Sequence, residues 1–373
     1  MNIILLIDKP GPGGAERQAA QLALGLAGQG HQVGLVTLFP GDWPAARDRI
    51  FLGGLIRAKA RSTPLTGLQL LGAAVRLGRL LGRRRPDVIY SLLHPSNLLA
   101  WLAKQGRGRA KLVWGIRASG GRLNWKQRLP FLACALVSPT VDLLIANSTA
   151  GLSHCREHGY RAKKQAVIPN GIDTRLFRPD PRGGRRVRAQ WGVEEGHKLV
   201  GLVARLHPKK DHPTFLRAAA RLARVRPEVR FVCVGGGPGR YRAELQALAV
   251  SLGLAGRLTW AGLRTDMPAV YSSLDLLASS SWSEGFSSAL GEALACGTPC
   301  VATDVGQARL VVGQTGLVVP SRDPEALSRG LERALRGEVA PGVVCRRRIQ
   351  DNFSLEKLIR ATEENFRQLV GGR

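Results

Sequence analysis

The sequence is poor in acidic and in aromatic residues. It has 27 Asp and Glu against 55 Lys and Arg, a formal net charge of +28, and aromatic residues make up 5% of its 373 positions. This charge favours an anionic partner, either nucleic acid or an anionic membrane surface. The few aromatics and the lack of a zinc finger, RRM signature or helix-turn-helix pattern argue against nucleic acid. Codon bias toward arginine is the alternative explanation of the charge.

The six cysteines form no Cys-x-x-Cys pair. Several lie in apolar segments, so buried free thiols in a reducing cytosol explain them better than disulfides or zinc ligation. Cys296 and Cys300 are the closest pair, and no nearby histidine completes a metal-ligand set with them.

Long uninterrupted apolar runs are also missing. The N-terminal run, residues 1–8, ends at an aspartate and lacks the basic start and cleavage site of a signal peptide. The apolar stretch 129–146 contains two prolines and Asp142, which interrupt any membrane-spanning helix. We therefore expect a cytoplasmic protein, with peripheral attachment to the inner face of the cytoplasmic membrane as its route to lipid.

Short apolar strands alternate with helical segments throughout the chain. The expected strands are 3–7, 32–37, 87–91, 111–116, 143–147, 198–204, 230–234, 258–260, 274–278, 300–302 and 315–319. The expected helices are 15–29, 65–81, 98–104, 212–225, 241–252, 267–273 and one after residue 284. This rhythm predicts an α/β fold of doubly wound, Rossmann-like parallel sheets, whose ligands bind at the carboxyl ends of the strands.

A chain of this length is too long for one ordinary core, so we expect two domains. The N-terminal domain is predicted over residues 1–176 and the C-terminal domain over 191–353. Residues 177–190, rich in Pro, Gly and Arg, have the composition of a surface linker. The last helix, 354–373, follows the second domain and can cross back onto the first. Ligand sites concentrate in the cleft that two such domains make.

Residues 64–85 form a basic amphipathic region that ends in Gly-Arg-Arg-Arg. A helix of this kind can lie on an anionic lipid surface. The alternative is a helix that packs in the fold and leaves its basic end in solvent.

Two glycine-rich loops follow predicted strands. Residues 11–17, Gly-Pro-Gly-Gly-Ala-Glu-Arg, open a helix, where glycines allow close approach of the backbone and the free N–H groups suit phosphate. The loop is not a G-x-G-x-x-G fingerprint, so a nicotinamide cofactor is not indicated. Residues 235–239 form the second loop. Each loop has a plain structural turn as its alternative.

Charged residues mark two further strand-to-helix junctions. Arg205 stands at a strand end and Lys210 at the next helix start, a spacing that would clamp a diphosphate unless the loop is simply solvated. Glu284 precedes Gly285-Phe286 in a loop, and Glu292 follows on the helix with seven residues between them. Two such carboxylates can reach both ends of one ligand; the alternative is a helix start with one solvated glutamate.

Taken in order, these motifs resemble glycosyltransferase family 4, the glycosyl transferases group 1. The resemblance rests on residues 13–16, on Pro-Asn-Gly-Ile-Asp at 169–173, on Arg205 with Lys210, and on the segment 284–292. It runs over nearly the whole chain. It implies the GT-B fold, in which two Rossmann-like domains face each other across a cleft.

The resemblance implies a retaining, metal-independent enzyme. Such an enzyme moves a hexosyl or N-acetylhexosaminyl group from a nucleotide sugar, with a UDP-sugar favoured, to a glycan or lipid-linked acceptor in the synthesis of surface polysaccharide or glycolipid. No cofactor is expected beside the nucleotide-sugar co-substrate. One alternative is a basic, non-catalytic GT-B-like protein that binds membrane or nucleic acid. Another is a different GT-B enzyme, such as a sugar-nucleotide epimerase.

The resemblance also implies residue roles on the donor side. Arg205 and Lys210 would neutralise the leaving diphosphate. Glu284 would hold hydroxyls of the donor sugar beside the backbone amides of Phe286 and Ser287. Glu292 would hydrogen-bond the ribose hydroxyls of the nucleotide.

The acceptor side is less regular. Gly13 and Gly14 would approach the diphosphate or the acceptor, and Glu16 follows them. His94, after the strand 87–91, is the catalytic candidate on this side, although a lone histidine before proline is more often a loop or core residue. Many relatives have a histidine after the next strand, where this chain has Arg117. Ser287-Ser288 likewise replaces a frequent Pro-Asn, so the motif does not identify the donor sugar.

Overall fold

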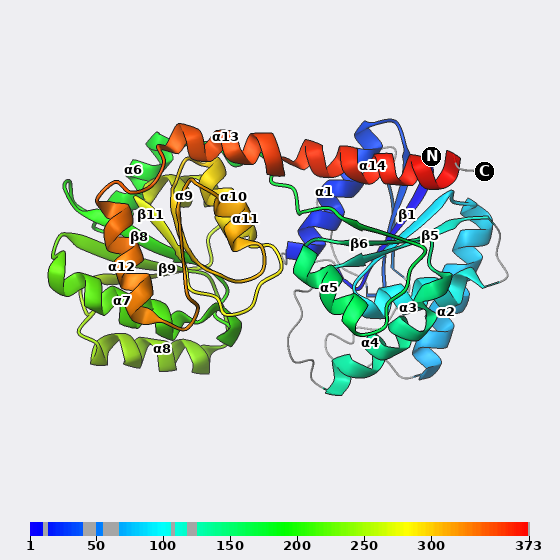
Figure 1. Ribbon diagram of the computed structural model, residues 1–373, viewed down its shortest axis with the longest axis horizontal. Helices are drawn as coiled ribbons and strands as arrows, with labels where there is room; N and C mark the ends of the chain where they lie inside the picture. The colour runs from blue at the N-terminus through cyan, green and yellow to red at the C-terminus, as the bar shows by residue number, and fades with distance from the viewer. Residues whose placement is uncertain (10–13, 40–49, 55–66, 106–108, 118–124, 372–373) are drawn as a thin grey trace. The chain divides into compact units, whose positions relative to one another are not determined.

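The computed structural model divides the chain into two compact units, Met1–Gly171 with Leu355–Arg373, and Ile172–Ser354. Each unit is a parallel sheet covered by helices on both faces (Figure 1). The structure describes residues 1–9, 14–39, 50–54, 67–105, 109–117 and 125–371. The prediction of two doubly wound α/β domains is confirmed.

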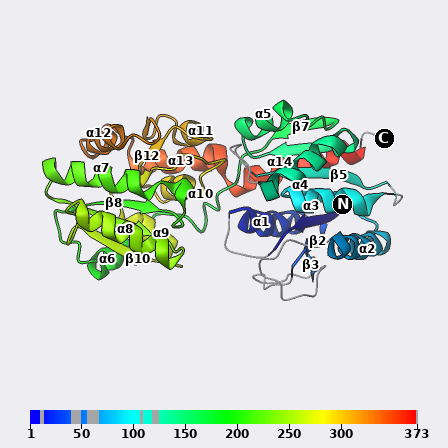
Figure 2. The ribbon, with the colours of Figure 1, turned by 90° about the horizontal axis from the view of Figure 1, so that it is seen from below.

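The first unit has a seven-stranded parallel sheet in the order β3-β2-β1-β4-β5-β6-β7, which Figure 2 shows from β7 at one edge to β3 at the other. The strands are β1 Asn2–Ile7, β2 Gln32–Thr37, β3 Ile50–Gly54, β4 Val88–Leu92, β5 Lys111–Ile116, β6 Leu143–Ala146 and β7 Lys164–Val167. The helices are α1 Gly14–Gly28, α2 Gly67–Arg84, α3 His94–Lys104, α4 Trp125–Val137, η1 Ser138–Thr140, α5 Thr149–Glu157 and α14 Leu355–Gly371.

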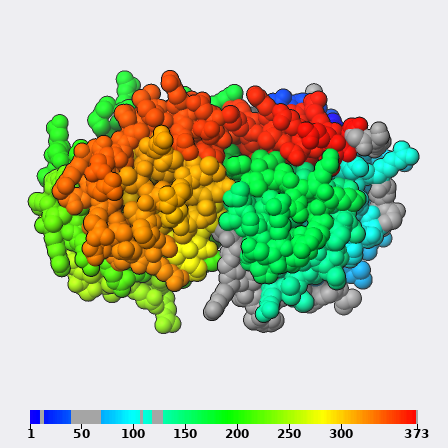
Figure 3. Space-filling view, in the orientation of Figure 1, coloured from blue at the N-terminus to red at the C-terminus, as the bar shows by residue number. Residues whose placement is uncertain are grey.

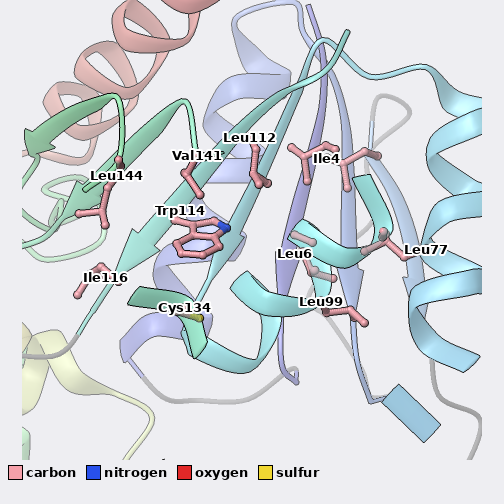
Figure 4. Close-up of a cluster of buried hydrophobic side chains, with 14 of the residues drawn as sticks. Ile4, Leu6, Leu77, Leu99, Leu112, Trp114, Ile116, Cys134, Val141 and Leu144 are labelled. Atoms are coloured by element: carbon pink, nitrogen blue, oxygen red, sulfur yellow. The ribbon is translucent and has the colours of Figure 1, made fainter. Parts of the chain in front are cut away.

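Side-chain alternation along the strands builds a separate core on each face of this sheet. In β5, Leu112, Trp114 and Ile116 belong to the core under α2, α3, α4 and α5. Figure 4 shows these three side chains in one cluster with Leu77 of α2, Leu99 of α3 and Cys134 of α4. Val113 points to the opposite core, which lies under α1 and α14. A strand buried on both faces becomes a continuous apolar run, which is why these segments were recognisable in the sequence.

The second unit has a six-stranded parallel sheet in the order β10-β9-β8-β11-β12-β13. The strands are β8 Lys198–Val203, β9 Val229–Val234, β10 Leu258–Gly262, β11 Leu276–Ser279, β12 Cys300–Thr303 and β13 Leu317–Val319. The helices are α6 Pro181–Gln190, η2 Pro208–Lys210, α7 His212–Val225, α8 Gly239–Ser251, α9 Met267–Ser273, α10 Ser288–Ala295, α11 Ala308–Val312, α12 Pro324–Leu335 and α13 Gly342–Phe353. Helices α7, α8 and α12 cover one face, and α9, α10, α11 and α13 cover the other.

Each sheet has one point where the winding direction reverses. In the second unit the chain proceeds from β8 to β9 on one side and later returns to β11 on the other side of β8. In the first unit the same reversal occurs between β1 and β4. The loops that leave two such strands turn away from each other and open a crevice at the carboxyl edge of the sheet.

The last helix, α14, belongs to the first unit. Phe366 is fully buried and meets Tyr90 edge-on with ring centroids 5.6 Å apart. Gly25 of α1 leaves the space that Ile359 fills, since a Cβ at Gly25 would lie 2.1 Å from the Ile359 Cδ1 atom. The helix is visible in red at the surface of this unit in Figure 3.

The expectation of a linker over residues 177–190 was wrong. These residues lie within the second unit, and most of them form α6. The Asp180 side chain caps that helix by accepting a hydrogen bond from Gly183 N at 2.9 Å, with Pro181 in the first turn. Pro therefore marks the start of a helix here, and Gly marks a close contact between helices. Composition alone does not distinguish these two roles from those of a linker.

Several elements were not predicted. The strands β3 and β7 and the helices α5, α11, α12 and α13 have short or mixed apolar patterns. Helix α4 continues through Pro130, which had been interpreted only as an interruption. Within the described residues, no helix is long and apolar enough to cross a membrane.

Helix α2 is the described part of the basic amphipathic region. Its apolar residues Ala73, Leu77 and Leu81 are buried in the core of the first unit. The apolar side of α2 therefore packs in the fold, and the basic side chains Arg83 and Arg84 at its end are exposed. Residues 64–66 lie outside the described part of the chain.

The tight packing of α6 predicts the effect of adding one methyl group. A Cβ at Gly184 would lie 2.6 Å from the Ser272 backbone oxygen, so we expect Gly184→Ala to lower the free energy of unfolding by about 1–3 kcal/mol. Gly82 in α2 has open space around it, and there the same substitution should stabilise by up to about 1 kcal/mol. Denaturant unfolding measures both. An unchanged stability in Gly184→Ala would mean that α6 is not packed as described.

Candidate active site

Lys210 and Glu284 meet at the carboxyl edge of the second sheet. Lys210 ends the short η2 turn after β8, and Glu284 lies in the loop after β11, the neighbouring strand across the reversal point. The ammonium group of Lys210 forms an ion pair with Oε1 of Glu284, and the Ser281 hydroxyl donates to the same oxygen at 2.8 Å. The Lys210 and Glu284 side chains are 27% and 14% exposed. Both charges are thus fixed in position and still reachable from solvent.

Backbone contacts hold the two loops together beneath this ion pair. The Ser280 hydroxyl lies 2.9 Å from the carbonyl oxygens of both Lys210 and Asp211. Trp282 donates from its backbone N–H to the Lys209 oxygen at 3.0 Å and from its indole N–H to the Pro208 oxygen at 2.9 Å. The cation is therefore placed before any ligand arrives, which is the arrangement that stabilises developing charge without reorganisation.

Sequence reasoning missed Ser280, Ser281 and Trp282. Their polar character directly after an apolar strand was the available signal, because polar groups at strand ends often serve a site. Arg322 adds a cation–π contact, with its guanidinium carbon 4.8 Å from the centre of the Trp282 ring.

Close packing against the neighbouring loop explains why the loop 235–239 is rich in glycine. Gly235 has φ +145°, and a Cβ there would lie 2.0 Å from the Ala204 oxygen. A Cβ at Gly237 would lie 2.5 Å from the Leu206 Cβ atom, and the Leu206 N–H donates to the Gly236 oxygen at 2.8 Å. The loop supports the backbone on both sides of Arg205, whose own side chain is exposed. Arg205 and Lys210 thus leave the same strand end.

Gly306 and Phe353 pack closely against the segment that begins at Glu284. Gly306 has φ +57°, and a Cβ there would lie 2.2 Å from the Glu284 oxygen. The Phe286 ring is buried against Phe353, with centroids 5.8 Å apart. Ser287 is also buried and stands at the N-cap of α10.

Glu292 occupies a different environment from Glu284. It is 4% exposed, and its Oε2 atom accepts a hydrogen bond from the Tyr271 hydroxyl at 2.8 Å. The alternative of a solvated glutamate is therefore wrong. The bond joins α10 to α9, an anchoring role that sequence spacing did not reveal.

At the reversal point of the first sheet the structure brings together Asp8 and the start of α3. Asp8 follows β1, and its Oδ1 atom accepts a hydrogen bond from the Ser96 hydroxyl at 2.6 Å. Burial raises the pKa of Asp8 to about 6. Asp8 was not among the candidates from sequence, although an acidic residue at the end of a buried strand was visible there.

His94 begins α3 at the same reversal point, after β4. Its ring packs edge-on against Phe131 with centroids 5.1 Å apart, and burial lowers the pKa of His94 to about 4. The buried Nε2 atom has no hydrogen-bond partner among the described residues. His94 is thus a neutral imidazole at neutral pH with one unused nitrogen.

The remaining acceptor-side candidates lie on α1 and after β5. Gly14 and Glu16 lie in the first turn of α1, and Gly13 is outside the described residues. Arg117, after β5, donates to Oδ1 of Asn170 at 2.6 Å and to the Tyr90 hydroxyl at 3.3 Å. It therefore ties β5 to the Pro-Asn-Gly segment.

That segment is also held by α1. The Gln18 amide donates to the Gly171 oxygen at 2.8 Å and accepts from the Gly171 N–H at the same distance. The spacing of the 13–16 and 169–173 motifs in the sequence gave no sign of this contact.

Comparison with known proteins agrees with this arrangement. A family model described as "Glycosyltransferase Family 4" matches residues 12–176, and one described as "Glycosyl transferases group 1" matches residues 197–337. Together the two models account for most of the chain. This chain belongs to glycosyltransferase family 4. The resemblance seen in its motifs is confirmed.

The sequence of this glycosyltransferase is similar to those of enzymes with a stated acceptor. It is 28% identical to the D-inositol 3-phosphate glycosyltransferase of Mycobacterium marinum, over 96% of this chain and 82% of that protein. It is 34% identical to the enzyme of the same name from Rhodococcus jostii, over 61% of this chain and 52% of that protein.

Solved structures show the same fold. The glycosyltransferase is similar to a sucrose-phosphate synthase from Thermosynechococcus elongatus, with a TM-score of 0.87, 22% identity and complete coverage of both chains. It is also similar to HepE from Anabaena in complex with UDP-glucose, with a TM-score of 0.81 and 23% identity over 98% of this chain and 99% of that one. The fold is GT-B.

The environment of His94 in this glycosyltransferase predicts a pH effect. Its pKa of about 4 lies below the ordinary 6.5, so the unfolded chain binds the proton more readily between those pH values. Stability from this group should therefore fall as pH drops from about 6.5 to 4, by at most about 3 kcal/mol. We expect His94→Gln to flatten this part of the stability profile, and the His94 ring resonances in NMR to titrate near pH 4. Titration near pH 6.5 would contradict the burial of the ring.

Proposed function

We propose that this glycosyltransferase moves a sugar from a UDP-sugar to a glycan or lipid-linked acceptor, with retention of configuration and without a metal ion. The observation that carries the proposal is the ion pair of Lys210 with Glu284, fixed by Ser280 and Trp282 at the reversal point of the second sheet. HepE, a structural neighbour, has been solved with UDP and with UDP-glucose, which supports a uridine donor.

The charges give each residue a role in the transfer. As the bond between the anomeric carbon and the phosphate oxygen breaks, negative charge grows on the diphosphate and positive charge on the sugar ring. Lys210 and Arg205 would stabilise the diphosphate, taking the place of a metal ion. Glu284 would hold sugar hydroxyls and balance the positive ring. It is a positioning and electrostatic group in this scheme.

One bond forms and one bond breaks at the anomeric carbon in this transfer. The acceptor oxygen forms a bond to the anomeric carbon on the face that the phosphate leaves. The acceptor proton passes to the departing phosphate oxygen, and UDP is the second product. Configuration is then retained with no covalent enzyme intermediate.

The nucleotide would extend from the phosphates along the carboxyl edge of the second sheet. Leu263, just after β10, is 83% exposed and rests over Gly236. It offers an apolar surface for the base on the far side of β9 from Arg205. Glu292 is proposed to meet the ribose, which requires a carboxylate oxygen to become accessible beside Tyr271.

A donor screen with matched variants tests the proposal. We expect UDP-glucose or another UDP-sugar to raise the melting temperature, while the GDP- and ADP-sugars do not. Lys210→Ala should lose that shift and lower the transfer rate by about 10²- to 10³-fold, and Glu284→Gln should lower the rate similarly. Lys209→Ala is the control. Lys209 is the neighbour of Lys210 in the sequence, but its side chain is exposed and has no part in the site.

Two outcomes would count against the proposal. Wild-type activity in both Lys210→Ala and Glu284→Gln would remove the site assignment. A protein that folds, binds anionic vesicles and responds to no nucleotide sugar would favour the non-catalytic alternative. Inositol phosphate belongs among the acceptors tested, because the Mycobacterium marinum relative carries that name.

We also propose that the first unit meets an anionic membrane through its α2–α3–α4 layer. On α4, Leu129, Leu132 and Leu136 are 75%, 46% and 82% exposed, one face of the helix at the spacing i, i+3, i+7. We call these three residues the α4 stripe. Leu102 of α3 and Leu71 of α2 extend the exposed apolar surface over the same face of the sheet.

Charge supports lipid as the occupant of this surface. Exposed arginines accompany the apolar side chains, namely Arg128 on α4 and Arg76, Arg79 and Arg83 on α2. Leucines that insert at the interface and cations that bind lipid phosphates act together in peripheral proteins. A lipid-linked acceptor would then be reached from the bilayer surface.

Vesicle binding tests this surface. We expect Leu129→Ser with Leu136→Ser to weaken binding to anionic vesicles at least about tenfold, since each leucine contributes apolar burial. Val250→Ser is the control, because Val250 is also 67% exposed but lies on α8 of the second unit. Wild-type binding should weaken with salt. Equal binding to neutral and anionic vesicles would remove the membrane proposal.

A further inference from the structure

Three potential metal ligands lie together at the carboxyl end of α5, far along the chain from the residues of the proposed transfer site. They are His154, Glu157 and His158, and one ligand atom from each lies within 4.8 Å of the others. The two imidazole rings are one helical turn apart, with centroids separated by 4.2 Å. Two histidines at i and i+4 share a helix face, and the glutamate adds a charged oxygen beside them.

A hydrogen bond fixes the form of His158 that can bind a metal. Its Nδ1 atom lies 2.8 Å from the His154 backbone oxygen. Since a carbonyl oxygen only accepts, Nδ1 must carry the proton, which leaves the lone pair on Nε2 free for a ligand. Donation of the second ring N–H to a backbone carbonyl is the usual arrangement of a metal-binding histidine.

Packing against one aromatic ring orients both imidazoles. The Phe131 ring lies 5.5 Å from the ring of His154 and 5.4 Å from that of His158. Phe131 is itself buried, and its backbone oxygen accepts the Tyr160 hydroxyl at 3.0 Å. The two histidines thus rest on a fixed surface, which lowers the entropy lost when they bind together.

The local charges permit a cation despite the basic chain. The neighbouring guanidinium groups are held elsewhere: Arg156 donates to Gln165 at 2.6 Å and Arg161 to the backbone oxygen of Arg156 at 2.9 Å. The end of a helix also favours positive charge.

We propose that His154, Glu157 and His158 form a binding site for a divalent transition metal ion of the zinc, nickel or copper class. Two imidazole nitrogens and one carboxylate oxygen suit these ions, with water completing the coordination. The site is separate from the transfer chemistry and needs none of its residues. A bound ion would clamp the last turn of α5 onto Phe131, against which His94 also packs.

Calorimetric titration of the untagged, chelator-treated protein with zinc chloride tests the site. We expect one ion to bind per chain. His158→Ala and His154→Gln should each lower the affinity at least about tenfold, and Glu157→Gln by less, because it removes only the charged oxygen. His197→Ala, in the second unit, is the control and should bind as the wild type does.

A second measurement separates metal binding from folding. Zinc should raise the melting temperature of the wild type and of His197→Ala, and not that of His158→Ala, whose side chain is exposed and whose unliganded stability should stay unchanged. The proposal is overturned if no ion binds. It is equally overturned if binding persists in both histidine variants, because the ion would then sit elsewhere. Loss of transfer activity in Lys210→Ala with intact zinc binding keeps the two proposals distinct.

Discussion

The candidate active site depends on the ion pair between Lys210 and Glu284. Two charges at a sheet edge attract each other in any solvent, but their use in catalysis requires that neither moves when the substrate charge changes. Here the loops that carry them are joined by the Ser280 hydroxyl and by both N–H groups of Trp282. The glycines at 235, 237 and 306 allow the supporting backbone to approach this closely. The rigid loop pair is the part of the structure that makes a diphosphate site possible.

Much of the fold could be predicted because its central strands are buried on both faces. Residues such as Leu112 to Ile116 are apolar without interruption, and that pattern identifies a parallel sheet without knowledge of tertiary contacts. Edge strands such as β7 and short helices such as α11 lack this pattern, so they were missed. The prediction of a linker was wrong for a related reason. Asp180 and Pro181 start a helix, and the glycines of α6 allow close packing against α9, which composition alone does not reveal.

The site could be predicted only in part. Glycines and charged residues at strand ends indicated Arg205, Lys210 and Glu284, since topology alone places such ends at one edge of a sheet. The supporting contacts could not be seen, because Ser280 acts through backbone oxygens far away in sequence. Glu292 is more deeply buried than Glu284, and burial also raises the pKa of Asp8. Those distinctions depend on neighbours in space.

The division of the chain has a consequence for its synthesis. The second unit, Ile172–Ser354, is inserted between two pieces of the first, and a backbone bond of 2.8 Å from Ile172 to Phe353 pairs its two ends. A ribosome therefore finishes the whole second unit while the first still lacks α14. Until Leu358, Phe366 and Leu369 emerge, this face of the first sheet is covered by α1 alone. The first unit is thus completed only after the second, and until then its incompletely covered apolar face is the surface that a chaperone would bind.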